Sequence, residues 1–228
     1  MISDFIALIF PNVCASCGKS LFKNERSICT YCSYYLPKTN FHFDSNNPVA
    51  KIFWGRVPIH SAAAFYGFNK GGKVQQIIHQ LKYKGHKQIG ITIGKWYGHE
   101  LLYCDDFNTA DTVIPVPLHP KKQKKRGYNQ SDYFAEGLAE SMNITADLTS
   151  LYRAYESDSQ TKKSRFSRWQ NVETIFKLRN AENLSGKHVL LVDDVVTTGA
   201  TLEACAHTLL KVPGVKVSIA TIAYAGNY

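Results

Sequence analysis

Hydrophobic positions from residue 60 onward alternate between the spacing of strands and the spacing of helices. Four apolar residues recur at i, i+3, i+4 and i+7 and predict one buried helix face: Val74, Ile77, Ile78 and Leu81. Residues 189–192 are wholly apolar, as expected of a central parallel strand that is buried on both faces. The same patterns predict further strands at 61–68, 112–116, 148–152 and 215–224, and further helices around 89–96, 134–142 and 202–209. This alternation is typical of an α/β fold with a mostly parallel, doubly wound sheet.

The chain divides by composition into three expected parts. Residues 1–40 hold four closely spaced cysteines and little core-forming material, and we interpret them as a small metal-binding module. Residues 41–58 are rich in Asn, Asp, Ser and Pro and are interpreted as a linker. Residues 59–228 carry the alternating pattern. A length of 228 residues fits one full domain with a small appendage, since an average domain has ~150 residues.

Composition narrows the class of protein. Hydrophobic residues make up 44% and charged residues 20%, which is ordinary for a globular chain and argues against disorder. No apolar run approaches the ~20 residues that a membrane-spanning helix needs. Residues 5–10 are apolar but lack the basic flank of a secretory signal. We therefore expect a cytoplasmic protein.

The charge is positive and concentrated. Lys and Arg number 27 against 18 Asp and Glu, a net charge of +9, which favours anionic partners such as phosphorylated metabolites, nucleic acid or a membrane surface. Five of the six residues at 121–126 and four of the seven at 162–168 are basic. Both tracts could equally be solvated loops.

Four of the six cysteines form two Cys-x-x-Cys pairs: Cys14, Cys17, Cys29 and Cys32. A disulfide framework is not expected in a cytosolic chain, whereas two such turns supply the four thiolates of a tetrahedral zinc site. A redox dithiol is the alternative, but two pairs without a βαβ unit around them argue against it. The zinc would be structural, because four thiolates leave no open coordination position. The remaining cysteines lie in apolar patterns and are expected in the core: Cys104 and Cys205.

The most informative stretch is residues 189–201. A buried strand ends in Asp193 and Asp194, and a loop with hydroxyl side chains and one glycine leads into a helix. Ligands of such sheets bind beyond the carboxyl ends of the strands, and N–H groups at a helix N-terminus attract anions. Gly199 would let the backbone approach a ligand closely. The residues expected to cradle a phosphate are Val195, Val196, Thr197, Thr198, Gly199, Ala200 and Thr201.

Two carboxylates beside a phosphate cradle would repel a bare phosphate. Their presence is explained if the ligand also carries hydroxyl groups or a magnesium ion, as a ribose 5-phosphate can. The alternative is a helix-capping turn with incidental acids. The Walker spacing and its lysine are absent, so the loop is not of that kind.

This run resembles the binding signature of type I phosphoribosyltransferases, which use 5-phosphoribosyl-1-pyrophosphate (PRPP). Residues 115–120 and 126–130 resemble the ComF family, also called the competence protein F family, which joins an N-terminal four-cysteine zinc module to a phosphoribosyltransferase domain. Residues 81–83, 161–165 and 168–172 extend the resemblance over nearly the whole chain. Tyr128 stands where many members carry Phe. The resemblance implies a type I phosphoribosyltransferase fold with a hood.

The resemblance also implies how a donor would bind. PRPP would enter as its magnesium complex, with Asp193 and Asp194 holding the ribose diol directly or through the metal's shell. The turn after Val116, with Pro117 and His119, would receive pyrophosphate. A catalyst must stabilise the charge on departing pyrophosphate, and Arg126 is the expected cation. His119 could equally be a histidine satisfied by the backbone.

A basic excursion at residues 152–170 corresponds to the flexible loop that covers PRPP in related enzymes. Loops that close over a site exclude water and complete the set of catalytic groups. The side chains expected to reach PRPP are Lys162, Lys163 and Arg165. A solvated charge run is the alternative.

Two functions of different kinds stay open. The first is an enzyme that transfers a phosphoribosyl group from PRPP to an acceptor that the sequence does not identify, with release of pyrophosphate. The second follows from the link of the ComF family to natural transformation: a protein that binds single-stranded DNA, alone or beside a competence helicase, and uses the PRPP site for binding or regulation. Basic tracts near aromatic residues such as Tyr128 are what single-strand binders use.

Overall fold

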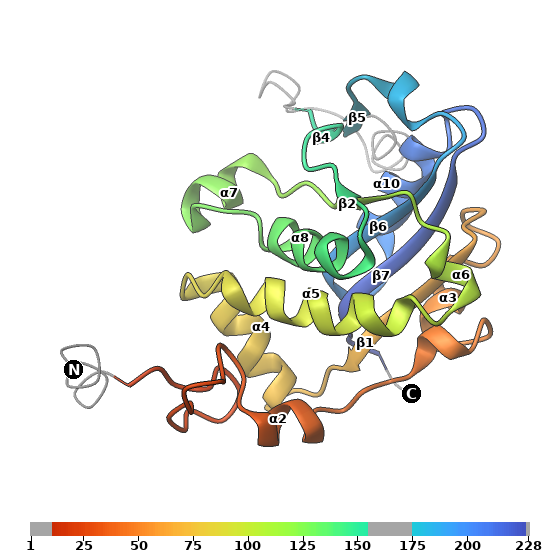
Figure 1. Cartoon of the computed structure of the whole chain (residues 1–228). Helices are drawn as coiled ribbons and strands as arrows, with labels where there is room; N and C mark the ends of the chain where they lie inside the picture. The colour runs from red at the N-terminus through yellow and green to blue at the C-terminus, as the bar shows by residue number, and fades with distance from the viewer. Residues whose placement is uncertain (1–10, 155–174, 227–228) are drawn as a thin grey trace.

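A computed structural model describes residues 11–154 and 175–226. Its central sheet has five strands in the order β1-β7-β6-β2-β3, and each neighbouring pair is parallel (Figure 1). The strands of this sheet are β1 Ser61–Gly67, β2 Thr112–Pro115, β3 Thr145–Ala146, β6 His188–Val196 and β7 Lys216–Tyr224. The strand predicted at 148–152 is present as β4 Leu151–Arg153, but it pairs antiparallel with β5 Phe176–Leu178 in a separate two-stranded sheet. The predicted parallel α/β sheet is therefore confirmed.

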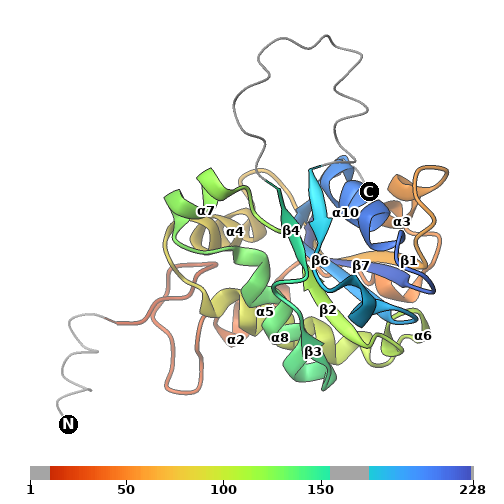
Figure 2. The same ribbon diagram turned by 90° about the horizontal axis from the view of Figure 1, so that it is seen from above.

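Helices cover both faces of the sheet (Figure 2). One face carries α4 Lys73–Tyr83, α5 Gln88–Leu101 and α8 Gln130–Met142, and the other carries α3 Pro48–Phe53 and α10 Ala200–Leu209. β6 shows why both faces are apolar: Leu190 and Val192 pack on the α4–α5–α8 side, whereas Val189 and Leu191 pack on the α3–α10 side. Successive side chains of a strand point to opposite faces, so a central strand must be hydrophobic throughout.

The pair α5 and α8 is held together by glycines. A Cβ atom on Gly94 would lie 2.5 Å from the carbonyl oxygen of Phe134, which no real side chain tolerates. A Cβ atom on Gly137 would collide in the same way with the carbonyl oxygen of Ile91. The two helices therefore touch backbone to backbone, and the start of α8 is held at the carboxyl edge of the sheet.

Residues 41–58, which were expected as a linker, are packed onto the sheet as η1 Phe41–Phe43 and α3. Asn47 caps α3 by accepting hydrogen bonds from the N–H groups of Val49 and Ala50, at 2.8 and 3.0 Å. Its amide also donates to the carbonyl of Ala62 on β1 at 2.8 Å. Val49 and Phe53 are fully buried. The Asn and Pro in this segment thus serve a helix start rather than a flexible connection.

The cysteine-containing segment packs against the α4–α5 face instead of having a core of its own. It includes the short helix α2 Thr30–Tyr35, and Ile28 and Leu36 belong to the same cluster of buried side chains as Tyr66 and Ile77. Cys104 and Cys205 are buried, as predicted. Within the described ranges, no helix combines the length and hydrophobicity that crossing a bilayer requires.

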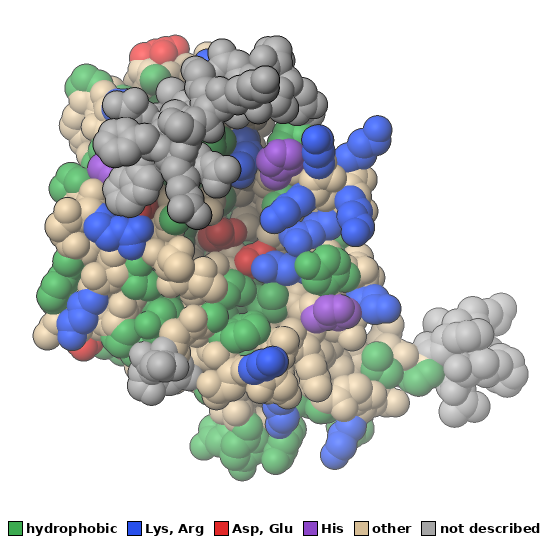
Figure 3. All heavy atoms as spheres, turned by 180° about the vertical axis from the view of Figure 1, so that it is seen from behind, with side chains coloured by type: hydrophobic (Ala, Val, Ile, Leu, Met, Phe, Trp, Pro, Cys, Tyr) green, Lys and Arg blue, Asp and Glu red, His purple; other side chains and the backbone are tan. Residues whose placement is uncertain are grey.

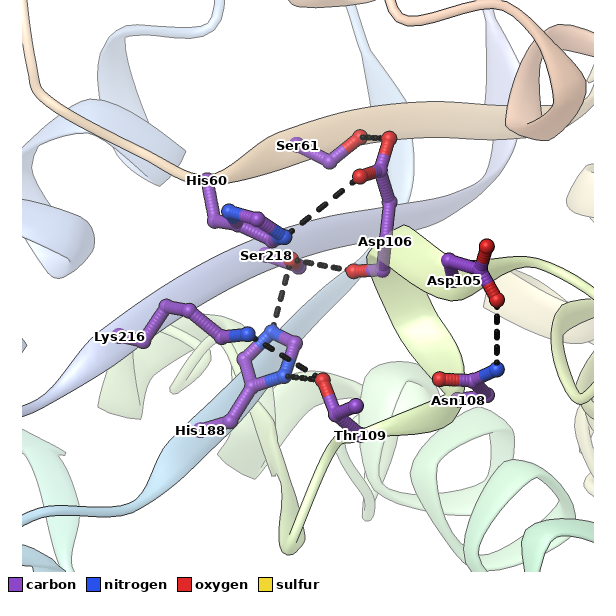
Figure 4. A network of polar contacts seen from close by, with 9 residues as sticks. All are labelled: His60, Ser61, Asp105, Asp106, Asn108, Thr109, His188, Lys216 and Ser218. Carbon is purple, nitrogen blue, oxygen red and sulfur yellow. Dashed lines mark hydrogen bonds and ion pairs between the residues drawn. The ribbon is translucent and has the colours of Figure 1, made fainter.

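A polar network lies at the amino edge of the sheet, where α6 Asp105–Asn108 meets the strand starts (Figure 4). The two ring nitrogens of His188 contact the hydroxyls of Thr109 and Ser218, each at 2.9 Å. Ser218 Oγ donates to the backbone carbonyl of Asp106, whose carboxylate lies 3.5 Å from His60 Nε2. Burial lowers the pKa of His188 to about 4. Because Ser218 is fully buried, this network is structural and lies at the opposite edge of the sheet from the predicted phosphate loop.

Candidate functional site

The two aspartates lie near the carboxyl end of β6, close to the start of α8. The carboxylate of Asp193 accepts a hydrogen bond from Ser131 Oγ and another from the N–H of Asp194, both at 2.8 Å. Burial, together with the charge of Asp194, raises the pKa of Asp193 to about 7. The pair therefore resists carrying two negative charges and favours a cation or hydroxyl donors from a ligand.

Asp194 is the more deeply buried of the two, with 4% of its surface exposed. Lys82 Nζ lies 2.7 Å from its Oδ1 atom. Its Oδ2 atom is buried and, in the part of the chain that the structure describes, has no hydrogen-bond partner. A buried acceptor without a donor is costly, and carboxylate oxygens are the ligands that magnesium prefers. The acid pair thus fits a magnesium ion or a ribose diol. Lys82 was not among the predicted site residues.

The predicted phosphate loop turns at Gly199, where φ is +73°. A Cβ atom there would lie 2.6 Å from the Cγ2 atom of Ile52 and 3.0 Å from the ring of Phe53, both on α3. Arg56, just after α3, donates to the carbonyl of Thr198 at 2.9 Å. Residues 41–58, which were expected as a linker, therefore pack against the phosphate loop and restrict its conformation.

Exposure divides the seven predicted loop residues. Val196 and Gly199 are buried and Val195 is half-buried, so they can offer only backbone groups to a ligand. The remaining members are exposed: Thr197, Thr198, Ala200 and Thr201. Since α10 begins at Ala200, the first N–H groups of this ten-residue helix, which have no partner within the helix, belong to the same short segment as the threonine hydroxyls.

The predicted pyrophosphate turn follows β2. The basic tract at 121–126, for which a solvated loop was one interpretation, forms the helix α7 Pro120–Arg126 with no buried residue. His119 caps this helix, because its Nδ1 atom accepts a hydrogen bond from the N–H of Lys121 at 3.1 Å. Desolvation and the nearby charge of Arg153 lower the pKa of His119. This favours the interpretation of His119 as a backbone-satisfied histidine. Pro117 lines a cleft of about 330 Å³.

Arg126 is the last residue of α7 and contacts Gln130 and Tyr83. Its Nη1 atom donates to Gln130 Oε1 at 2.7 Å, and its guanidinium lies 5.1 Å from the centre of the Tyr83 ring. Tyr128 is buried and its hydroxyl donates to the carbonyl of Leu81, so the expectation that it could serve as a stacking aromatic is wrong. Asn129 donates to the carbonyl of Val116 at 3.1 Å and ties the start of α8 to the turn after β2.

The structure thus brings the predicted donor-site residues to one edge of the sheet. Figure 3 shows acidic side chains recessed in the surface, with Lys and Arg side chains gathered to one side of them. The family resemblance includes residues 81–83, but it gave no contact for Lys82 or Tyr83, and no signal in the sequence indicated Ser131. Three predicted residues lie outside the described residues: Lys162, Lys163 and Arg165.

The four predicted zinc ligands converge on one point. Their sulfur atoms all lie within 4.8 Å of one another, and the Sγ atoms of Cys17 and Cys29 are 3.8 Å apart. A tetrahedral site with Zn–S distances of ~2.3 Å has S···S distances of roughly 3.8 Å. Burial alone would raise the pKa of Cys14, but N–H groups of Cys29, Cys17 and Ser16 outweigh it and lower that pKa to about 7. The donor set fits a four-thiolate metal centre, which Cys32 completes.

The chain is similar in sequence to a family model and to several known proteins. A family model described as a phosphoribosyl transferase domain matches residues 129–228. DNA utilization protein YhgH of Escherichia coli is 27% identical over 210 residues, which cover 90% of this chain and 87% of that protein. Competence protein F of Haemophilus influenzae is 35% identical over 102 residues, 44% of each chain. Competence protein ComFC of Bacillus subtilis is 33% identical over 99 residues, 43% of this chain and 38% of that one.

Solved structures to which the chain is similar include an amidotransferase and a phosphoribosyltransferase. A glutamine PRPP amidotransferase from B. subtilis is 22% identical, covers 62% of this chain and 30% of that chain, and has a TM-score of 0.42. An adenine phosphoribosyltransferase is 14% identical, covers 66% and 74% of the two chains, and has a TM-score of 0.40.

Proposed function

We propose that this chain, which belongs to the ComF family and has the predicted type I phosphoribosyltransferase fold, binds PRPP with magnesium. In this proposal it transfers the phosphoribosyl group of PRPP to an acceptor. The observation that carries the proposal is the buried acid pair beside a helix N-terminus, with one Asp194 oxygen left without a partner in the described part of the chain. A phosphate cradle and a diol-binding acid pair together match a ribose 5-phosphate and not a phosphate alone.

Each group of the site has a distinct task in this proposal. The loop from Thr197 to Thr201 holds the 5′-phosphate through backbone N–H groups and hydroxyls. Asp193 and Asp194 hold the ribose hydroxyls directly or through the metal, and magnesium, when bound, neutralises charge on the pyrophosphate. Arg126 stabilises the negative charge that grows on pyrophosphate as the bond to C1′ breaks. We also propose, on the family resemblance, that Lys162, Lys163 and Arg165 close over PRPP.

A zinc ion bound by the four cysteines belongs to the same proposal as a structural element. The four thiolates leave no position for a substrate, so the ion would hold the two turns of residues 1–40 in place against α4 and α5. The division of the chain at residues 40 and 58 into module, linker and transferase domain likewise stays a proposal about folding units.

Titration calorimetry with magnesium–PRPP tests the donor site. The wild type should bind with one site per chain, and the Asp193→Asn/Asp194→Asn variant should lose binding. The chain offers a matched control in Asp105→Asn/Asp106→Asn, a second pair of adjacent aspartates that lies at the opposite edge of the sheet. Equal binding by the wild type and the 193/194 variant, or no binding by either, would overturn the proposal.

An exposed tyrosine cluster favours a second function, the binding of single-stranded DNA. Tyr31, Tyr34 and Tyr35 on α2 are 62, 79 and 59% exposed. The ring of Tyr35 lies 4.6 Å from that of Tyr31 and 4.9 Å from that of Tyr34, and Lys73 Nζ lies 5.2 Å from the Tyr31 ring. Aromatic rings beside cations are what bases and phosphates of a single strand require. The relatives' names refer to competence and DNA utilization, and a competence helicase as partner stays part of this second proposal.

Anisotropy titrations with a labelled oligothymidine separate the two functions. Tyr31→Ala/Tyr34→Ala should weaken DNA binding, whereas Trp54→Ala, an exposed aromatic at the end of α3, should not. The logarithm of affinity should fall with the logarithm of salt concentration by roughly 0.7 per neutralised phosphate. The Asp193→Asn/Asp194→Asn variant should keep DNA binding. Loss of DNA binding in that variant would contradict a separate DNA surface.

A further inference from the structure

The last turn of α4 contacts both halves of the proposed donor site. The carbonyl of Leu81 accepts a hydrogen bond from the hydroxyl of Tyr128, and the ring of Tyr83 lies 5.1 Å from the guanidinium of Arg126. Both contacts attach α4 to the segment that follows the proposed pyrophosphate turn. Lys82 lies between these two anchored residues and points to the acid pair instead.

The contact between Lys82 and Asp194 is short and mostly shielded from water. Nζ and Oδ1 are 2.7 Å apart, and the two side chains are 20 and 6% exposed. Only one oxygen of the carboxylate is used, because Oδ2 has no donor among the residues described. A pair built for stability alone would be expected to satisfy both oxygens. The unpartnered oxygen remains an acceptor for a second cation or for a hydroxyl group of a ligand.

We propose that Lys82 is a cation of the donor site that compensates the negative charge of the acid pair when no metal is bound. It permits PRPP to bind without magnesium, and it competes with magnesium for Asp194. The inference rests on the proposed PRPP site. It adds a binding residue and a defined relation between that residue and the metal.

The chemistry of lysine suits this role. An ammonium is a compact point charge on a flexible four-carbon stem, so it can turn from a carboxylate to a nearby phosphate oxygen without moving the backbone. The hydrogen bond of Leu81 and the ring contact of Tyr83 hold that backbone in place. Without any cation, a ligand that carries several phosphate charges would meet the uncompensated negative charge of the acid pair, and the repulsion would oppose binding.

The proposal predicts two changes of opposite sign in Lys82→Met. Affinity for a divalent metal alone should rise, because the ammonium no longer competes for Asp194. Affinity for PRPP in the presence of EDTA should fall by about fivefold or more, the effect of one unit charge at ~4 Å even in a water-like dielectric. A lysine with a purely structural role would weaken both interactions when it is removed.

The experiment uses the full chain with its zinc bound. Electron paramagnetic resonance measures the affinity for Mn²⁺ alone, and calorimetry measures PRPP binding in EDTA and in excess Mg²⁺. Lys82→Arg keeps the charge and should restore PRPP binding in EDTA. Lys95→Met is the matched control, because it breaks a surface ion pair with Glu140 and should change neither quantity.

Folding and the two proposals can be separated. Removal of the lysine leaves Asp194 buried without its partner, so Lys82→Met/Asp194→Asn, which keeps neither charge, shows by its melting temperature whether that charge destabilises the variant. PRPP binding that requires Mg²⁺ equally in the wild type and in Lys82→Met would overturn this inference and leave the proposed function standing. Absence of PRPP binding by the wild type under every condition would overturn both. Weaker Mn²⁺ binding by Lys82→Met would contradict the competition for Asp194.

Discussion

The ring of Phe53 occupies the space that a side chain on Gly199 would need. A Cβ atom at position 199 would lie 3.0 Å from Cε1 and 3.1 Å from Cζ of that ring. Phe53 belongs to α3, and Gly199 is the residue before α10. The proposed phosphate loop is therefore shaped by a helix that lies far earlier in the chain, since Phe53 precedes Gly199 by 146 residues.

Gly199→Ala should damage both stability and the site. The substitution adds a side chain at φ +73° and forces it against α3, so we expect a loss of about 1–3 kcal/mol of unfolding free energy and a clear loss of PRPP affinity. Urea unfolding and calorimetry measure the two effects. Gly186→Ala is the control, because it has φ +71° with nothing within 4 Å of its Cβ position, and so reports the backbone strain alone. Equal destabilisation by both variants would mean that the contact with α3 is unimportant.

Asn47→Ala tests whether residues 41–58 are part of the folded domain. The change removes the cap of α3 and the hydrogen bond to Ala62, so it should cost about 1–3 kcal/mol of stability. Asn47→Asp keeps the cap but loses the amide donor, so its unfolding free energy should lie between those of the wild type and Asn47→Ala. Equilibrium unfolding in urea distinguishes the three chains. A flexible linker would show no difference among them.

Cys14→Ser should lower the zinc content below one ion per chain. Because the cysteine-containing segment shares its core with α4 and α5, hydrogen exchange should speed up in α2 and α4, and much less in β6. Metal analysis and exchange mass spectrometry provide the two readouts. Cys104→Ser changes a buried cysteine outside the cluster and should leave the zinc content intact. A full zinc complement in Cys14→Ser would argue against a site built from all four cysteines.

His188 should make stability depend on pH. Burial lowers its pKa in the folded chain from the ordinary value of 6.5 to about 4, so the unfolded chain binds a proton that the folded chain does not. Its contribution is complete above pH ~6.5 and is lost progressively as the pH falls from there towards ~4. Unfolding free energies at several pH values should fall less steeply in His188→Gln than in the wild type. An unchanged slope would assign the acid sensitivity to other groups.

Arg126→Ala should weaken PRPP binding by about tenfold or more, since it removes the charge-assisted contact to pyrophosphate that we propose for this residue. Lys122→Ala removes a charge of the same sign from the same exposed helix and should have a much smaller effect. Calorimetry on the two variants under identical salt conditions makes the comparison. Equal losses would show that α7 acts only through its overall charge.

The sheet was predictable because its central strand carries its own signal. Residues 189–192 are apolar at every position, and only burial on both faces explains that pattern. The donor-loop residues follow this strand directly, so their place at the carboxyl edge could be predicted with it. The contacts of Lys82 and Ser131 with the acid pair could not be predicted, because these residues lie on helices 112 and 62 positions earlier in the chain. The family resemblance included residues 81–83 but did not say what Lys82 would contact.

Two helices are marked in the sequence by their end residues and not by hydrophobic periodicity. Asn47 followed by Pro48 is a helix cap followed by proline at the first helical position, which indicates a helix start inside the segment interpreted as a linker. In the same way, Pro120 and Gly127 bracket the basic tract as a helix start and a helix end. The basic tract has no apolar face, so hydrophobic periodicity could not predict this helix. Only the residues at its two ends indicate it.

The contact between α5 and α8 also limits how the proposed donor site can vary. Side chains can change rotamer around a substitution, but the carbonyl oxygens that meet Gly94 and Gly137 have no such freedom. The spacing between α5 and α8 is therefore set by the radii of backbone atoms, and α8 is the helix whose start carries Ser131, the donor to Asp193. New ligand preferences at this edge would have to arise in the turn after β2 or in the loop before α10, since the spacing between α5 and α8 cannot change without a backbone clash.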